Sequence, residues 1–114
     1  LSHLNNPWQP AVLKMIKMTV EGAQRASVTA GKKKYVSVCG EAAADPALAV
    51  VLIGLGVDTL SMNAGAIPAV AAVLKSVTKE KAQQIAAIAL QQISSAEAKE
   101  SARQALPILD ELGL

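Results

Sequence analysis

The sequence has little cysteine and few aromatic residues. Its 114 residues include one Cys, one Trp, one Tyr and no Phe. A single cysteine excludes an intramolecular disulfide framework and a cysteine-rich metal site. It also fits a reducing compartment, so we expect a cytoplasmic protein. Hydrophobic residues still make up 52% of the chain, so a single small domain would build its core mainly from Ala, Val, Leu and Ile.

The sequence also lacks a dominant charge and a long apolar run. Eleven Lys and Arg residues stand against nine Asp and Glu residues, so the net charge indicates no particular partner. The one basic cluster, Lys32-Lys33-Lys34, has no broad basic face or row of aromatics around it, and we expect no nucleic-acid binding. Residues 47–57 form the most apolar stretch, which is shorter than the ~18 residues of a membrane span. No membrane insertion is expected.

The first half of the chain predicts one helix followed by a strand. Helical spacing of apolar residues from about Ala11 indicates a helix that ends in the small, polar segment 26–31. Residues 34–39 are typical of a short strand, and residues 41–44 of a turn. We expect the three methionines, Met15, Met18 and Met62, to fill the core.

Helix-start signals then organise the second half. Asp45 is suited to cap a helix that begins at Pro46 and ends at Gly56. Residues 58–63 predict a second strand, with Asp58 at its beginning, and residues 64–66 a tight turn. Three more helices are expected: one from Pro68 to about residue 77, one capped by Thr78 and running to about residue 93, and a last one capped by Ser94 or Ser95. Pro107 is expected to kink the last helix.

The alternation of strand and helix predicts two parallel strands joined by a right-handed crossover, and therefore an α/β fold. Two parallel strands are too few for a stable sheet, because both faces need cover and both edges are unpaired. The chain begins with Leu1 and not with Met. We therefore expect it to be a piece of a larger domain.

Cys39 is the residue best placed for chemistry. It ends the β-branched strand at residues 36–39 and stands directly before Gly40 and a helical region. The C-terminal ends of barrel strands are where α/β barrels carry catalytic side chains. A buried structural cysteine is the alternative interpretation.

Several motifs around Cys39 resemble one enzyme family. They are Val38-Cys39-Gly40-Glu41, Asp45-Pro46, Gly54-Leu55-Gly56-Val57-Asp58, Leu60-Ser61-Met62 and Ile67-Pro68, preceded by Ser2-His3-Leu4 and Pro10-Ala11-Val12-Leu13. Over roughly positions 1 to 110 they resemble the C-terminal phosphoenolpyruvate-binding domain of phosphoenolpyruvate–protein phosphotransferase, enzyme I of the bacterial sugar phosphotransferase system. The segment after Glu41, Ala42-Ala43-Ala44, departs from the usual pattern of that family.

The resemblance implies a fold and a reaction. The fold is a (β/α)8 TIM barrel, of which residues 1–114 would supply the last two strands, their helices and the closing helices, incomplete on their own. The reaction moves a phosphoryl group from phosphoenolpyruvate to a histidine on another domain, and then to a histidine-containing carrier protein in sugar uptake. By this resemblance Cys39 protonates the enolate to give pyruvate.

The resemblance also implies partners and a cofactor. The family uses Mg²⁺, but its carboxylate ligands, its arginines and its phosphorylated histidine all match positions before Leu1, so we assign no metal ligand in this chain. Gly40 and Asn63 are expected to lie at the substrate. His3 is expected to make a structural hydrogen bond, and Glu41 to act in a turn or cap. The family forms homodimers through this domain.

Two other interpretations stay open. The Cys-Gly-Glu motif is shared with pyruvate phosphate dikinase and phosphoenolpyruvate synthase, so the chain could be a fragment of either enzyme. A protein of another class, a non-catalytic helical interaction module, would have the same Ala-rich composition, and Cys39 would then have no chemical role.

Overall fold

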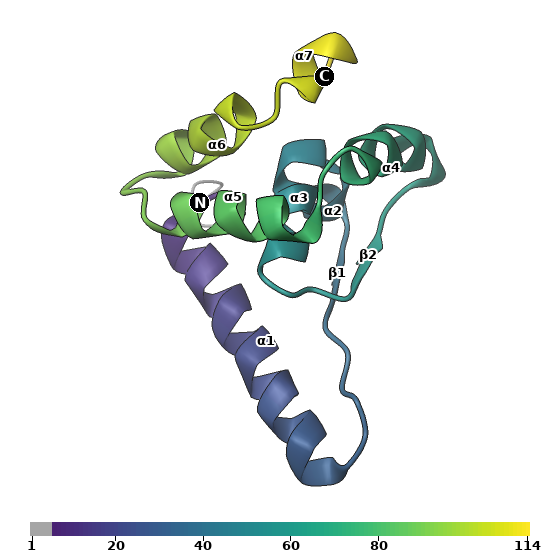
Figure 1. The fold of residues 1–114 in the computed structure, drawn as a ribbon, viewed down its shortest axis with the longest axis vertical. Helices are drawn as coiled ribbons and strands as arrows, with labels where there is room; N and C mark the ends of the chain where they lie inside the picture. The colour runs from purple at the N-terminus through teal and green to yellow at the C-terminus, as the bar shows by residue number, and fades with distance from the viewer. Residues whose placement is uncertain (1–5) are drawn as a thin grey trace.

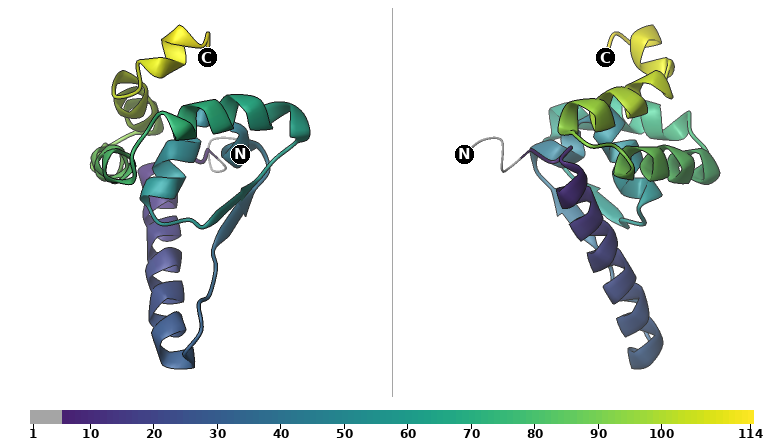
Figure 2. Two further views of the ribbon diagram at one scale, coloured as in Figure 1. Left: turned by 45° about the vertical axis from the view of Figure 1, so that its right-hand side comes forward. Right: turned by 90° about the vertical axis from the view of Figure 1, so that its left-hand side faces the viewer.

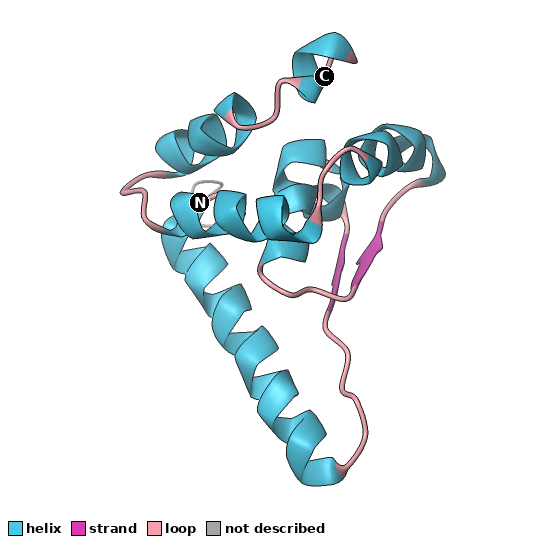
Figure 3. Cartoon of the chain, in the orientation of Figure 1, coloured by secondary structure: helices cyan, strands magenta, loops and turns pink. Residues whose placement is uncertain are grey.

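The computed structural model describes residues 6–114, in which helices pack on one side of a small sheet (Figure 1, Figure 3). The chain is mostly helical, as Figure 3 shows by colour. Its elements in order are α1 (Pro10–Ala30), β1 (Ser37–Cys39), α2 (Glu41–Ala44), α3 (Pro46–Gly54), β2 (Thr59–Ser61), η2 (Ala64–Ala66), α4 (Ile67–Lys75), α5 (Lys79–Leu90), α6 (Ser95–Gln104) and α7 (Ile108–Glu111).

The sheet consists of the predicted parallel pair. β1 and β2 lie side by side in the register Ser37↔Thr59, Val38↔Leu60 and Cys39↔Ser61. Helices α2 and α3 connect the two strands, which is the crossover that parallel strands require. Both strands are shorter than the sequence predicts, because only these residues form the ladder. The pair is compatible with part of a phosphoenolpyruvate-binding domain.

Helix α3 lies at the centre of the core. Asp45 caps it as predicted: its Oδ1 accepts hydrogen bonds from the backbone N–H groups of Ala47, at 3.1 Å, and Leu48, at 3.4 Å. The six residues 47–52 are all buried. Helix α5 packs closely against α3, since a Cβ added to Gly54 would collide with the carbonyl oxygen of Ala82. The core is made almost entirely of aliphatic side chains, as the composition predicts.

Helix α1 confirms one expectation and contradicts another. It ends at Ala30, within the predicted segment 26–31, and its C-terminal half extends away from the other helices (Figure 2). The expectation that Met15 and Met18 fill the core is wrong, because they are 66% and 69% exposed. The buried residues of α1 are Pro10, Leu13 and Val20, and the helical period places both methionines on the side opposite Leu13 and Val20.

The end of the chain also corrects the sequence analysis. Pro107 does not kink one helix but separates two, since α6 ends at Gln104 and α7 begins at Ile108. Proline lacks the N–H that would continue the helix, and its ring clashes with the carbonyl one turn earlier. The predicted caps Thr78 and Ser94 are confirmed: their hydroxyls accept from the N–H groups of Lys81 and Glu97, respectively. The predicted turn at residues 41–44 is the single-turn helix α2.

Within the part of the chain that the structure describes, no helix has the length and apolar character needed to cross a membrane.

Candidate active site

The two strands present one face to the helical core and the other to solvent. Val38 and Leu60 pack against the core. Successive side chains of a strand point to opposite faces, so their neighbours point away from the helices. These neighbours, which are mostly exposed and form what we call the open face, are Ser37, Cys39, Thr59 and Ser61. The Cys39 thiol therefore lies on the open face, next to its register partner Ser61.

Gly40 turns the chain sharply after Cys39. Its backbone has φ 93° and ψ −153°, a conformation that is open almost only to glycine. The Gly40 N–H donates to the carbonyl oxygen of Ser61 at 3.0 Å, and α2 begins at the next residue. Cys39 is thus the last residue of its strand, at the C-terminal end of the sheet, as the sequence analysis expected.

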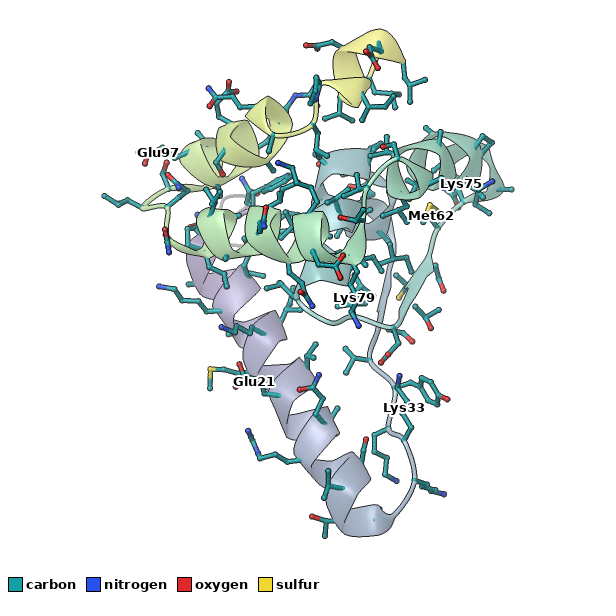
Figure 4. All side chains as sticks on the ribbon, in the orientation of Figure 1. Glu21, Lys33, Met62, Lys75, Lys79 and Glu97 are labelled. Carbon is teal, nitrogen blue, oxygen red and sulfur yellow. The ribbon has the colours of Figure 1, made fainter. Side chains whose placement is uncertain are left out.

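Asn63 reaches the same end of the sheet from β2. It precedes η2, and its carbonyl oxygen accepts a hydrogen bond from the Ala66 N–H at 2.9 Å. A hollow of about 340 Å³ lies between the two strand ends; its walls are Gly40, Glu41, Ala44, Ser61, Met62, Asn63 and Ala66. Figure 4 labels Met62 in this region, beyond β2. The structure therefore brings the two predicted substrate-binding residues, Gly40 and Asn63, to one hollow beside the strand end that carries Cys39.

Other predicted residues do not form a metal centre. Glu41 lies in the first turn of α2 and is exposed. Across residues 6–114, no three His, Cys, Asp or Glu side chains gather where they could hold a metal ion. The described residues therefore do not fit Mg²⁺ as a ligand set. His3 lies outside the described residues.

Asp58 joins the two strands at the opposite end of the sheet, where the sequence analysis placed it. Its Oδ2 accepts from the Val36 N–H at 2.9 Å, and its Oδ1 pairs with Lys33 Nζ at 3.2 Å. The Val36 hydrogen bond, followed by Lys33, holds the pKa of the Asp58 carboxyl below its ordinary value. The Lys33 ammonium also lies 5.2 Å from the ring centre of Tyr35; Figure 4 shows Lys33 on the segment that returns to β1.

Trp8 makes a contact with Asp45 that the sequence analysis did not predict. Trp8 is only 4% exposed, and its indole Nε1 donates to Asp45 Oδ2 at 3.0 Å. Asp45 directly follows α2, the helix that begins after Gly40. A lone Trp in a Pro-rich segment was the only sequence signal, and it named no partner.

A thiol and an amide at the C-terminal ends of adjacent parallel strands define an α/β domain of the type that binds small substrates at the strand ends. The chain belongs to the family described as "PEP-utilising enzyme, PEP-binding domain", PEP being phosphoenolpyruvate, which it matches over residues 1–79. This match includes α1 to α4 and all the residues of the hollow.

Relatives extend the similarity toward the C-terminus. The chain is 42% identical over 106 residues to the phosphoenolpyruvate-protein phosphotransferase of Streptomyces coelicolor. These aligned residues make up 93% of this chain and 18% of that protein. It is 39% identical over 100 residues to the protein of the same name from Haloferax volcanii, covering 88% of this chain and 17% of the relative. With a multiphosphoryl transfer protein of Xanthomonas campestris it shares 45% identity over 82 residues, 72% of this chain and 9% of that protein. The chain thus spans less than a fifth of the length of these relatives.

Proposed function

We propose that these residues form the C-terminal part of the phosphoenolpyruvate-binding barrel of a phosphoenolpyruvate–protein phosphotransferase. The observation that carries the proposal is the joint position of Cys39, Gly40 and Asn63 at the C-terminal ends of two parallel strands. The family match and the names of the relatives support the same enzyme. In this proposal the barrel works with a phosphoryl-accepting histidine on another domain, a histidine-containing carrier and a second subunit, in the cytoplasm.

Cys39 is the proton donor in the proposed reaction. The bond between phosphorus and the enol oxygen breaks, a bond from phosphorus to a histidine nitrogen forms, and the enolate of pyruvate remains. Carbon 3 of the enolate then takes the proton of the Cys39 thiol, and the thiolate regains a proton from solvent. An ordinary thiol is mostly protonated at neutral pH, which is the state a general acid needs.

Gly40 and Asn63 would hold the substrate. Gly40 has no side chain, so its backbone allows a small molecule to approach the strand end closely. The Asn63 amide supplies both a donor and acceptors at the rim of the hollow. The ligands of the Mg²⁺ that the family uses would lie in other parts of the domain.

A chimaeric enzyme tests this function directly. The present 106 matched residues would replace the equivalent segment of the Streptomyces coelicolor phosphotransferase, and pyruvate release from phosphoenolpyruvate would be followed with Mg²⁺ and a carrier protein. Cys39→Ala should lower kcat by roughly 10²- to 10⁴-fold, the usual contribution of a general acid. Ser37→Ala is the matched control, since Ser37 lies on the same open face one side-chain period earlier.

The outcomes separate the alternatives. A large loss in Cys39→Ala with normal turnover in Ser37→Ala supports the proposal. Unchanged turnover in Cys39→Ala would refute the proton-donor role. Turnover that requires AMP in the longer protein of which we propose this chain to be a part would place the chain in the dikinase or synthase branch. A chimaera that folds but never releases pyruvate favours a non-catalytic module.

A further inference from the structure

We infer that Trp8 is a positioning residue for Cys39 and acts through the carboxylate of Asp45. The inference rests on the proposed function for its chemical meaning, but its geometry is independent of that function. Trp8 lies 31 positions before Cys39 in the sequence, yet it contacts the segment that leads directly out of the Cys39 turn. Three observations carry the inference.

First, Trp8 is itself fixed. The Trp8 N–H donates to Asn6 Oδ1 at 2.9 Å, and the Gln9 N–H donates to the Asn6 carbonyl oxygen at 3.1 Å, so residues 6–9 form a tight turn. Helix α1 begins directly after this turn, at Pro10. The Trp8 ring is 4% exposed and belongs to the core cluster. Its indole N–H therefore has a defined direction.

Second, Asp45 uses both carboxylate oxygens. Oδ1 accepts from the N–H groups of Ala47 and Leu48 at the start of α3. Oδ2 accepts from Trp8 Nε1 at 3.0 Å. Hydrogen bonds to an ionised acceptor are stronger than neutral ones. Asp45 therefore joins the turn at residues 6–9 to the first turn of α3.

Third, only a short, packed segment separates Asp45 from Cys39. That segment is Gly40 followed by α2 (Glu41–Ala44). Helix α2 contacts β1, β2 and α3, and Ala43 within it is fully buried. A displacement of Asp45 would therefore shift α2 and with it Gly40. The Gly40 N–H donates to the Ser61 carbonyl oxygen and so joins the ends of the two strands. Cys39 directly precedes Gly40, the donor of that hydrogen bond.

The test uses the 114-residue chain and two variants that break the same contact from opposite sides. Trp8→Phe keeps an aromatic ring in the core but removes the N–H donor. Asp45→Ser keeps a good helix cap but is too short to reach Trp8. Amide hydrogen exchange would be followed at Gly40 and, as a reference, at Ala86 and Ala89 in α5. A nitroxide label on Cys39, the only cysteine of the chain, reports the mobility of the strand end.

Both variants should lose protection at Gly40 by roughly tenfold while the α5 amides keep theirs, because only the local unit opens. The nitroxide spectrum of both should also become more mobile. Ile85→Val is the control, since it weakens the core in α5 and leaves both side chains of the Trp8–Asp45 hydrogen bond in place. Equal loss of protection at Gly40 and in α5, as in the control, would overturn the inference, as would an unchanged nitroxide spectrum. Neither readout uses phosphoenolpyruvate, so a failure here is distinct from a failure of the proposed function.

Discussion

Helix α3 and the β1–β2 pair are neighbours with opposite surroundings. Residues 47–52 of α3 are buried on every side. In the strands only Val38 and Leu60 face the core, and their neighbours on the open face contact solvent. The residues of the proposed site all lie at the strand ends: Cys39 is the last residue of β1, Gly40 follows it, and Asn63 follows β2. The comparison shows that in this chain α3 supplies packing, while the strands and the turns after them carry the residues of the proposed site.

The difference has a physical origin. A parallel pair normally has cover on both faces, whereas the described residues cover one. Burial holds α3, while the strands depend on a three-residue ladder and on hydrogen bonds at each end, from Gly40 to Ser61 and from Val36 to Asp58. Changes in α3 should therefore act on global stability, and changes at the strands should act on local geometry.

The largest expected effect comes from one substitution made in both regions. Leu52 in α3 is 1% exposed, and Leu52→Ala should cost about 4 kcal/mol of unfolding free energy, because a buried leucine loses its contacts and leaves a cavity. Leu60 in β2 is half-buried, so Leu60→Ala should cost about 2 kcal/mol. Urea unfolding of both variants checks the difference. Equal losses would mean that the strands are held by packing as firmly as α3.

The next effect depends on the close approach of α3 and α5. An added Cβ at Gly54 would collide with the Ala82 carbonyl carbon at 2.6 Å, so Gly54→Ala should cost about 3 kcal/mol by forcing the helices apart. Gly22 in α1 is the matched control, since its Cβ would meet only the end of Arg25 at 3.8 Å. Gly22→Ala should stabilise the chain by about 0.5–1 kcal/mol through helix propensity. Thermal unfolding would show shifts of opposite sign, and a neutral Gly54→Ala would contradict the packing argument.

Local signals were enough to predict most of the fold. Asp45, Thr78 and Ser94 mark helix starts by residue type and position, and the structure places each as a cap. Ser27 and Thr29 lie in segment 26–31, where the sequence predicts the end of α1, and the structure ends the helix late in that segment, at Ala30. In the structure their hydroxyls donate to the carbonyls of residues 23 and 25, one turn earlier, and the helix continues.

The site could be predicted only where topology determines it. Parallel strands bring their C-terminal ends together, so Gly40 and Asn63 were expected to share one end of the sheet, and they line one hollow. The Trp8–Asp45 contact joins residues 37 positions apart. No periodic pattern or cap signal links such distant residues, because their contact depends on how α1 and α3 pack.

The smallest expected effect concerns the end of the sheet away from Cys39. The pKa of Asp58 is lowered in the folded chain, first by the Val36 N–H and then by Lys33. Its contribution to stability is therefore complete above the ordinary carboxyl range of about 4, and is lost as the pH falls through the lowered folded value. Wild type should lose unfolding free energy more steeply below pH ~4 than Asp58→Asn, which keeps an oxygen for Val36 but carries no charge.

Lys33→Met separates the two causes of this pH dependence. The variant removes the ion pair and leaves the Val36 hydrogen bond to the Asp58 carboxylate intact. The Val36 hydrogen bond is the larger cause of the lowered Asp58 pKa. Lys33→Met should therefore keep most of the wild-type dependence of unfolding free energy on pH, measured by urea unfolding from pH ~2 to ~6. If the unfolding free energy of Lys33→Met depended on pH as weakly as that of Asp58→Asn, the ion pair with Lys33 would be the main cause of the lowered Asp58 pKa. In that case added salt should weaken it, because salt screens charges that are exposed to solvent.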